Sequence, residues 1–235
     1  MRPFESDPVR VLWVEGSPKG EQSLSSACAR RVVEVASDAT PCDVVHLDVW
    51  TSDLPEFGRD AALAKFAPLL GDELTPEQTA LWARVGAAIA DLATFDVVLV
   101  STPMWNWSIP YRLKQWFDVV CQPGRTFTLD AQGRHVGVLG VGKIAQLIVA
   151  RSSAYDGRSP EMADFQQPYL EYLLGGMFGY TLGDTLVLEP TTRFTPEERE
   201  AVWVEAVERA AATGERLGRL IAERRAGANA AGPAS

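Results

Sequence analysis

The sequence predicts one α/β domain built on a doubly wound parallel sheet. Short apolar runs, such as residues 97–100, alternate along the chain with segments whose apolar residues recur at helical spacing. Several of these runs end in polar loops, as expected of buried parallel strands that lead into helices. The length of 235 residues is compatible with a single domain.

The first half of the chain opens with a strand at residues 9–14 and a polar turn at 15–20. A helix follows, with one apolar face formed by Leu24, Cys28, Val32 and Val35. A second strand at 42–49 leads into an irregular excursion at 50–72, which carries a short helix around 61–66. A segment of this length in a compact domain is often a lid or an interface.

A helix start is predicted at Thr75. Thr75 is a capping residue, Pro76 occupies the first helical position and Gln78 the third, so this helix runs from there to about Leu92. It leads to the third strand, which is followed by an aromatic loop at 103–110 and by a helix at 111–120 with apolar residues at helical spacing.

The second half of the chain begins with a β-hairpin flap at 126–138, because two alternating runs bracket a glycine-containing connection. A strand at 144–150 and a polar loop at 151–157 follow. Next come a helix at 163–176, a strand near 185–188 and a long helix that starts with a cap at Thr195 and runs to about residue 223. We expect a disordered lead-in at 1–8, a domain at 9–225 and a disordered tail at 226–235.

Five strands separated by helices favour the order 2-1-3-4-5, which is the flavodoxin-like arrangement. In this order the loops after the first and third strands lie on either side of the point where the connections reverse direction. Ligands bind at such points in open α/β sheets. The predicted site therefore lies where these two loops meet.

Composition excludes several classes of function. The chain carries 31 acidic against 22 basic residues, a net charge of −9, which argues against nucleic acid as a partner. The three cysteines are odd in number and lack metal-site spacing, and His46 and His135 are isolated, so we expect no disulfide framework and no metal site. No apolar run approaches the roughly 20 residues needed to span a bilayer. We expect a cytoplasmic protein without membrane segments.

The loop after the first strand carries hydroxyls at Ser17, Ser23 and Ser25, just before a helix. Backbone N–H groups and the helix dipole favour an anion there, and the hydroxyls add donors. The alternative is that Ser23 or Ser25 merely caps the helix, since serine is a preferred cap. The loop lacks the glycine spacing of dinucleotide or triphosphate sites, so a monophosphate is the expected ligand.

The loop after the third strand reads Pro103-Met104-Trp105-Asn106-Trp107-Ser108-Ile109-Pro110. Two indoles, a thioether and an amide suit a flat heteroaromatic ligand. Aromatic residues at strand ends usually belong to the core, which is the alternative. One phosphorylated, flat cofactor would satisfy this loop and the serine loop together.

These two loops, the loop at Arg151, Thr126-Phe127 and Leu74-Thr75-Pro76 resemble those of the FMN-dependent NAD(P)H azoreductases and quinone reductases of the flavodoxin-like fold. The resemblance covers roughly residues 9–222. It implies that FMN is bound by Ser17, Ser23, Leu24, Ser25, Pro103, Met104, Trp105, Asn106, Trp107, Ala150, Arg151, Ser152 and Ser153. It also implies a substrate pocket formed by Trp105, Trp107, Phe127 and Phe57.

Two departures from the family pattern concern the site. Trp105 and Trp107 stand where family members commonly have tyrosine and phenylalanine, which bears on the size of the substrate. Ser152 and Ser153 replace a pair of glycines, which bears on the geometry near the pyrimidine edge of the flavin.

The resemblance implies an enzyme that transfers electrons in pairs from NADH or NADPH to quinones and azo compounds by a ping-pong hydride transfer. No catalytic side chain is implied, because N5 of the flavin carries the hydride. The implied partners are a small aromatic acceptor (a quinone, azo or nitro compound) and a second copy of the chain, since members are homodimers with interface sites. Two alternatives remain: a flavin-dependent tailoring reductase of a biosynthetic pathway, and an electron-transfer flavodoxin.

Overall fold

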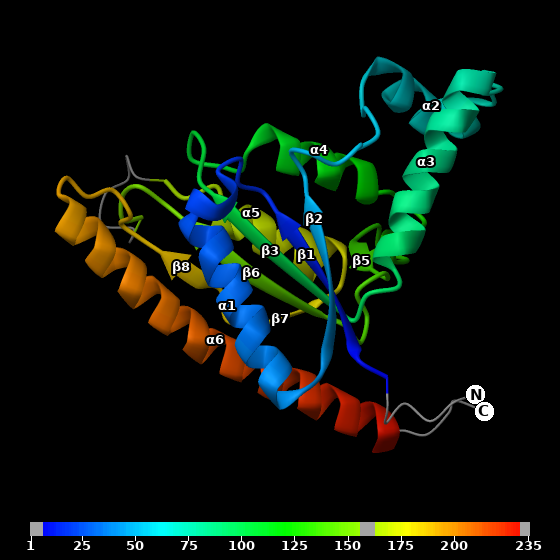
Figure 1. The fold of residues 1–235 in the computed structure, drawn as a ribbon. Helices are drawn as coiled ribbons and strands as arrows, with labels where there is room; N and C mark the ends of the chain where they lie inside the picture. Colours follow the sequence, from blue (N-terminus) through cyan, green and yellow to red (C-terminus); the bar gives the residue numbers. More distant parts are fainter. Residues whose placement is uncertain (1–6, 156–162, 231–235) are drawn as a thin grey trace.

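The computed structural model of the chain describes residues 7–155 and 163–230. Its centre is a parallel sheet of β1 (Val9–Glu15), β2 (Cys42–Asp48), β3 (Val97–Pro103) and β6 (Ile144–Ala150), with β7 (Thr181–Leu182) and β8 (Leu186–Leu188) both paired to β6. The order is β2-β1-β3-β6-β7 (Figure 1). The predicted strand order is confirmed, except that two short strands share the fifth position.

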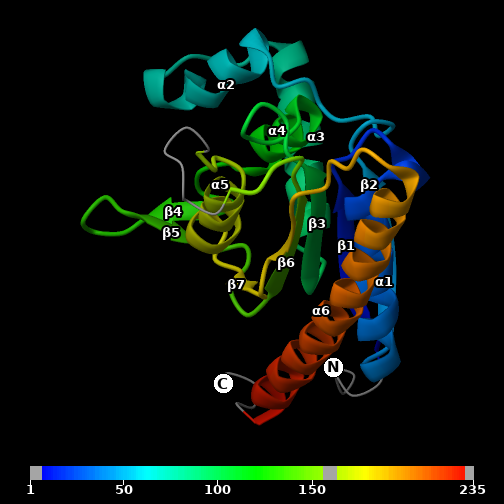
Figure 2. The same ribbon diagram turned by 90° about the vertical axis from the view of Figure 1, so that its left-hand side faces the viewer.

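Helices cover both faces of the sheet, and each face has its own apolar core (Figure 2). On one face α1 (Leu24–Ala39) packs against α6 (Pro196–Ala230). Gly214 makes this contact possible, since a Cβ there would lie 2.7 Å from the Val32 carbonyl oxygen. On the other face lie α3 (Pro76–Leu92), α4 (Tyr111–Val120), α5 (Gln167–Glu171) and the π-helical turn Tyr172–Met177.

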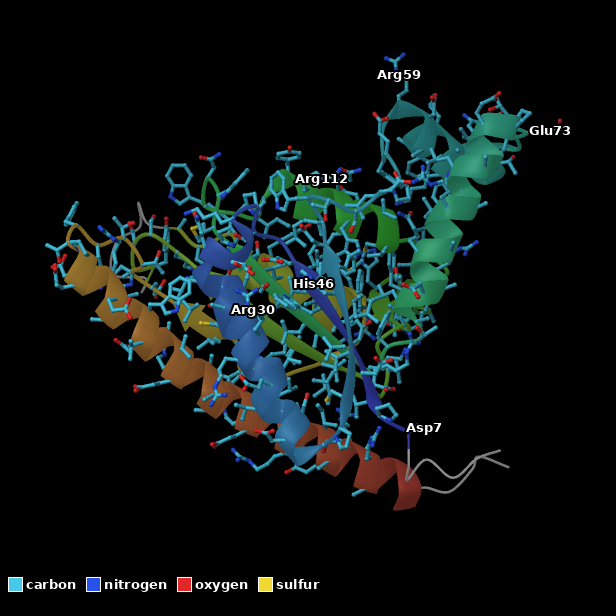
Figure 3. All side chains as sticks on the ribbon, viewed as in Figure 1. Asp7, Arg30, His46, Arg59, Glu73 and Arg112 are labelled. Atoms are coloured by element: carbon cyan, nitrogen blue, oxygen red, sulfur yellow. The ribbon has the colours of Figure 1, made fainter. Side chains whose placement is uncertain are left out.

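The excursion after β2 contains α2 (Arg59–Leu70), which is longer than the predicted helix at 61–66 and stands off from the sheet in both views (Figures 1 and 2). The start of the excursion is fixed to α4. Arg112, labelled in Figure 3, donates from Nε to the Val49 carbonyl at 2.9 Å and from Nη2 to the Ser52 carbonyl at 3.0 Å. The predicted capping box at Thr75 and Gln78 is present at the start of α3.

The predicted hairpin is formed by β4 (Phe127–Leu129) and β5 (His135–Gly137), which pair antiparallel and project from the body of the molecule (Figure 2). Among the helices of the described residues, none is both long enough and apolar enough to cross a bilayer.

Two predicted boundaries are wrong. The helix expected at 163–176 begins at Gln167 and passes into the π-helical turn, because Asp164 instead accepts main-chain hydrogen bonds from the residues that open the helix. The last helix continues to Ala230, so residues 226–230, predicted to be disordered, are helical. Alanine is a strong helix former and prolongs the helix through this stretch. The predictions for residues 1–6, 231–235 and the end of the polar loop at 151–157 fall outside the described residues.

Candidate functional site

A hollow of about 420 Å³ lies at the carboxyl ends of β1, β3 and β6. This volume falls within the range of roughly 300–1,000 Å³ that small-molecule sites occupy. The hollow collects the loops that follow three neighbouring strands of the sheet. Its lining residues are Ser17, Pro18, Lys19, Gln22, Ser23, Leu24, Ser25, Pro103, Met104, Trp105, Ala150, Ser152, Thr191, Thr192, Arg199, Val202 and Trp203.

The three predicted serines meet at one end of the hollow, where α1 begins. Ser17, Ser23 and Ser25 are all buried, and the Ser23 and Ser25 hydroxyl oxygens lie 3.1 Å apart. Ser23 is the N-cap of α1, and its hydroxyl accepts from the Ser26 main-chain N–H at 3.3 Å. The capping alternative is therefore correct for Ser23, but capping does not account for Ser17 or Ser25. Hydroxyls at a helix N-terminus provide the donors and the positive potential that an anion requires.

The aromatic loop after β3 forms a two-residue hairpin turn. Trp105 and Ser108 exchange two main-chain hydrogen bonds of 3.0 Å each, and the residues between them, Asn106 and Trp107, have φ of +46° and +67°. Positive φ at both central positions is the pattern of a type I′ turn. It is uncommon for a bulky residue such as tryptophan, and such strain concentrates at functional sites.

This turn separates the two predicted indoles. Trp105 lines the hollow and lies 5.5 Å from the Trp50 ring, centroid to centroid. Trp107 is half exposed at the tip of the turn and does not line the hollow, and neither does Asn106. The Trp107 carbonyl accepts from the Phe165 N–H at 3.1 Å, which ties the tip to the segment before α5. The tip of the turn therefore lies beside the hollow and is anchored through its main chain.

The loop after β6 presents Ala150 and Ser152 to the hollow, while Arg151 and Ser153 are not among the lining residues. Arg151 is buried, and its guanidinium pairs with Asp164 at 2.7 Å and with Glu189 at 3.1 Å. A buried cation is stable only with such partners. The Arg151 side chain therefore stabilises the loop through these two ion pairs and does not line the hollow.

Phe57 and Phe127, the other two predicted pocket residues, lie away from the hollow within one chain. Phe57 packs edge-on against Trp82 of α3, with ring centroids 6.2 Å apart. Phe127 packs against His135 across the hairpin, at 5.1 Å. Phe57 belongs to the excursion at 50–72 and Phe127 to the hairpin; because members of the family are homodimers with interface sites, we expect these two segments to complete the partner's pocket.

The last helix contributes residues to the hollow that were not predicted from the sequence. Thr191 and Thr192 precede α6, and Arg199, Val202 and Trp203 lie in its first turns. Arg199 brings a second cation to a hollow that already has Lys19. A tryptophan in a helix otherwise rich in alanine and charge was the one sequence signal available.

A buried carboxylate lies behind the serine loop. Glu15, the last residue of β1, is 3% exposed. Its Oε1 accepts from the Ser26 hydroxyl, and its Oε2 lies 2.8 Å from His46 Nε2. The His46 ring stacks on Trp13, with centroids 4.2 Å apart. His46 is a residue of strand β2, and its side chain is also the partner of this carboxylate.

Within the described ranges, 7–155 and 163–230, no group of three or more histidine, cysteine, aspartate or glutamate residues could hold a metal ion.

Comparison with known families matches a model of the flavodoxin-like fold to residues 9–213, which is most of the chain. The chain belongs to the flavodoxin-like family. The FMN-dependent NADH:quinone oxidoreductase of Nitratidesulfovibrio vulgaris (strain DP4) is 44% identical over 202 residues, covering 85% of this chain and 95% of the relative. An FMN-dependent NADH:quinone oxidoreductase 3 of Pseudomonas fluorescens is 34% identical over 212 residues, covering 88% and 97%.

Solved structures place the chain in the same fold. An azoreductase from Bacillus anthracis is 27% identical, with a TM-score of 0.76, and the match covers 88% of this chain and 99% of that one. A second structure from that organism, an FMN-dependent NADH-azoreductase in complex with FMN, is 19% identical with a TM-score of 0.71, which supports the fold alone.

Proposed function

We propose that this protein is an FMN-dependent NADH oxidoreductase that reduces quinones and azo compounds. The observation that carries the proposal is the hollow itself, in which buried serine hydroxyls at the start of α1 and the Met104-Trp105 edge of the aromatic turn share one cavity. The match to the relatives named FMN-dependent NADH:quinone oxidoreductase covers nearly the whole length of those proteins, and this supports the same reaction here.

The polar end of the hollow fits the phosphate of FMN. Ser17, Ser23 and Ser25 would hold the phosphate oxygens at the N-terminus of α1, and Lys19 and Arg199 bring positive charge to the same cavity. A helix N-terminus favours a dianion through its dipole and its free N–H groups. The chain as a whole is acidic, with a net charge of −9, whereas the residues that line this hollow include two cations and no carboxylate.

The other end of the hollow fits a flat ring. Met104 and Trp105 line it from the β3 side, and Ala150 and Ser152 from the β6 side. The Met104 N–H donates to the Ala150 carbonyl at 2.8 Å, so these two loops are held together before any ligand enters. When bound, FMN supplies two-electron hydride chemistry, and the protein's task is to bind, orient and shield it. We propose that donor and acceptor use this site in turn, in a ping-pong sequence.

We also propose a homodimer. Three large apolar side chains are exposed around the aromatic turn: Trp107 within it, Phe165, whose N–H donates to the Trp107 carbonyl, and Tyr111, whose ring lies 6.5 Å from that of Trp105. Exposed apolar surface is typical of an interface. A partner would bring Phe57 or Phe127 to the acceptor pocket, as the family resemblance suggests. Size-exclusion chromatography with light scattering tests this proposal, and a monomer at working concentration would refute it.

A cytoplasmic location completes the proposal. All three cysteines are free thiols, and reduced thiols are the rule in the cytosol. Cell fractionation of the source organism, with detection of the native protein, tests this location.

The activity is tested by spectroscopy on the purified protein. We expect a yellow protein, or one that takes up added FMN, whose visible absorbance is bleached by NADH without oxygen and restored by a benzoquinone or an azo dye. Initial rates with both substrates varied should give parallel double-reciprocal lines, as a ping-pong sequence requires. A protein that binds FMN but is not bleached by NADH would be an electron-transfer flavodoxin, and one that takes up no flavin would refute the proposal.

A further inference from the structure

Glu15 lies directly behind the proposed phosphate end of the hollow. Its carboxylate accepts from the Ser26 hydroxyl in the first turn of α1, the same turn that carries Ser23 and Ser25 into the hollow. Glu15 does not line the hollow, and at 3% exposure it is shielded from water. A negative charge is thus fixed to the N-terminus of α1 from the side opposite the ligand.

His46 is the group that can neutralise this charge. Its Nε2 lies 2.8 Å from Glu15 Oε2, and its side chain is 44% exposed, so it can exchange protons with solvent although Glu15 is buried. Histidine is the side chain that changes charge within the physiological pH range. The Glu15–His46 pair therefore carries one negative charge when the imidazole is neutral and no net charge when it is protonated.

Few other charges face this pair. Trp13, which β1 pairs with His46 of β2, stacks on the imidazole, and its Nε1 donates to Ser101 Oγ of β3 at 2.8 Å. From α1 comes Arg30, whose guanidinium lies 5.8 Å from the centroid of the Trp13 ring; Figure 3 labels both Arg30 and His46. The contacts from β1, β3 and α1 thus add the cation of Arg30 and the neutral side chains of Trp13, Ser101 and Ser26.

We infer that Glu15 and His46 set the affinity of the site for the phosphate of FMN, with the tightest binding when His46 is protonated. This inference rests on the proposed function. The negative charge of Glu15 lowers the positive potential that the α1 N-terminus offers to a phosphate. Protonation of His46 neutralises that charge and restores the positive potential. Both are positioning residues that act through α1 and the local field, and neither touches the cofactor.

The expected size of the effect follows from Coulomb's law. A unit charge at roughly 10 Å from a phosphate dianion changes the binding constant about 4-fold at the dielectric constant of water, and by more at a lower effective dielectric constant. Removing the negative charge of Glu15 should therefore tighten FMN binding by at least this factor when His46 is neutral. A role limited to holding Ser26 in place predicts the opposite sign, because loss of a structural contact weakens binding.

The test is a fluorescence titration of the full chain, stripped of flavin, with FMN and with riboflavin, at about pH 6 and about pH 8. Riboflavin lacks the phosphate and reports effects on the ring alone. The variants are Glu15→Gln, His46→Gln and, as a matched control on α1, Glu34→Gln, an exposed carboxylate paired with Arg31. Because the FMN phosphate also titrates near pH 6, variants are compared with wild type at each pH.

We expect Glu15→Gln to bind FMN at least about 4-fold more tightly than wild type near pH 8 and riboflavin with unchanged affinity. His46→Gln should bind FMN more weakly than wild type near pH 6 and equally near pH 8. Glu34→Gln should match wild type throughout. Far-ultraviolet circular dichroism confirms that each variant is folded, and His46→Gln tests the inference alone if Glu15→Gln does not fold.

Two outcomes overturn the inference. One is a Glu15→Gln variant whose FMN affinity equals or falls below that of wild type at both pH values. The other is an equal change for FMN and riboflavin, which would mean a structural role. If the wild-type chain binds FMN and is bleached by NADH, these outcomes leave the proposed function intact. If the wild-type chain binds neither flavin, the proposed function fails and this inference fails with it.

Discussion

Comparing Trp107→Ala with Trp107→Gly measures what the left-handed backbone at residue 107 costs in stability. Both variants lose the ring, and they differ only in how readily the residue adopts φ near +67°. The left-handed region costs an L-residue about 1–2 kcal/mol, and glycine avoids this cost. Glycine also gives the unfolded chain more conformational freedom, which offsets about 0.5–1 kcal/mol of this advantage.

We therefore expect the free energy of unfolding of Trp107→Gly to exceed that of Trp107→Ala by about 1 kcal/mol, which is about 2–4 °C in Tm for a chain of this size. Urea unfolding measures it, without flavin, because a bound ligand adds to the apparent stability. Ser108, which closes the same turn, has no positive φ, so Ser108→Ala should be more stable than Ser108→Gly. An alanine variant at Trp107 as stable as the glycine variant would refute the left-handed turn.

Three further predictions concern stability. Arg151→Met should lower the free energy of unfolding by about 3–5 kcal/mol, because it leaves two partly buried carboxylates without their cation, and a loss below about 1 kcal/mol in urea would contradict this. Gly214→Ala should cost about 1–3 kcal/mol, since its methyl group would meet an α1 carbonyl, whereas Gly227→Ala, with open space around it, should be neutral or stabilising in the same assay. Burial raises the pKa of Cys28 and of Tyr169 to about 12 each, so the unfolded chain releases these protons at a lower pH than the folded chain does. The urea midpoint should therefore fall as the pH rises from about 9 towards 12. A midpoint that does not change over this range would refute the assignment.

Local chemistry explains which parts of the fold could be predicted from the sequence. The start of α3 was predicted because Thr75 and Gln78 satisfy each other's main-chain donors within four residues. The buried strands β1, β3 and β6 were predicted because a strand covered on both faces reads as a continuous apolar run. The strand order followed from the alternation of strands and helices.

The missing parts depend on contacts between distant segments. Apart from Trp203, nothing near Arg199 in the sequence indicates that the first turns of α6 reach the serine loop, since this results from the packing of α6 along α1. Arg151 was expected from the family resemblance to bind FMN, but Asp164 and Glu189, from later in the chain, bind its guanidinium. The positive φ of Trp107 was also out of reach, because tryptophan rarely adopts it and no glycine marks the turn.

The two edges of the sheet differ in their exposure to self-association. At one edge β7 and β8 are short and interrupted, and Arg209 of α6 donates to the Val187 carbonyl at 2.7 Å, so this edge offers little continuous backbone to another strand. At the other edge β2 runs for seven residues with Val44 and Val45 exposed. The strand carries two charged residues, Asp43 and Asp48, and charged side chains commonly protect edge strands. Near the isoelectric point of about 4.8 that protection weakens, so acid-induced aggregation should begin along β2.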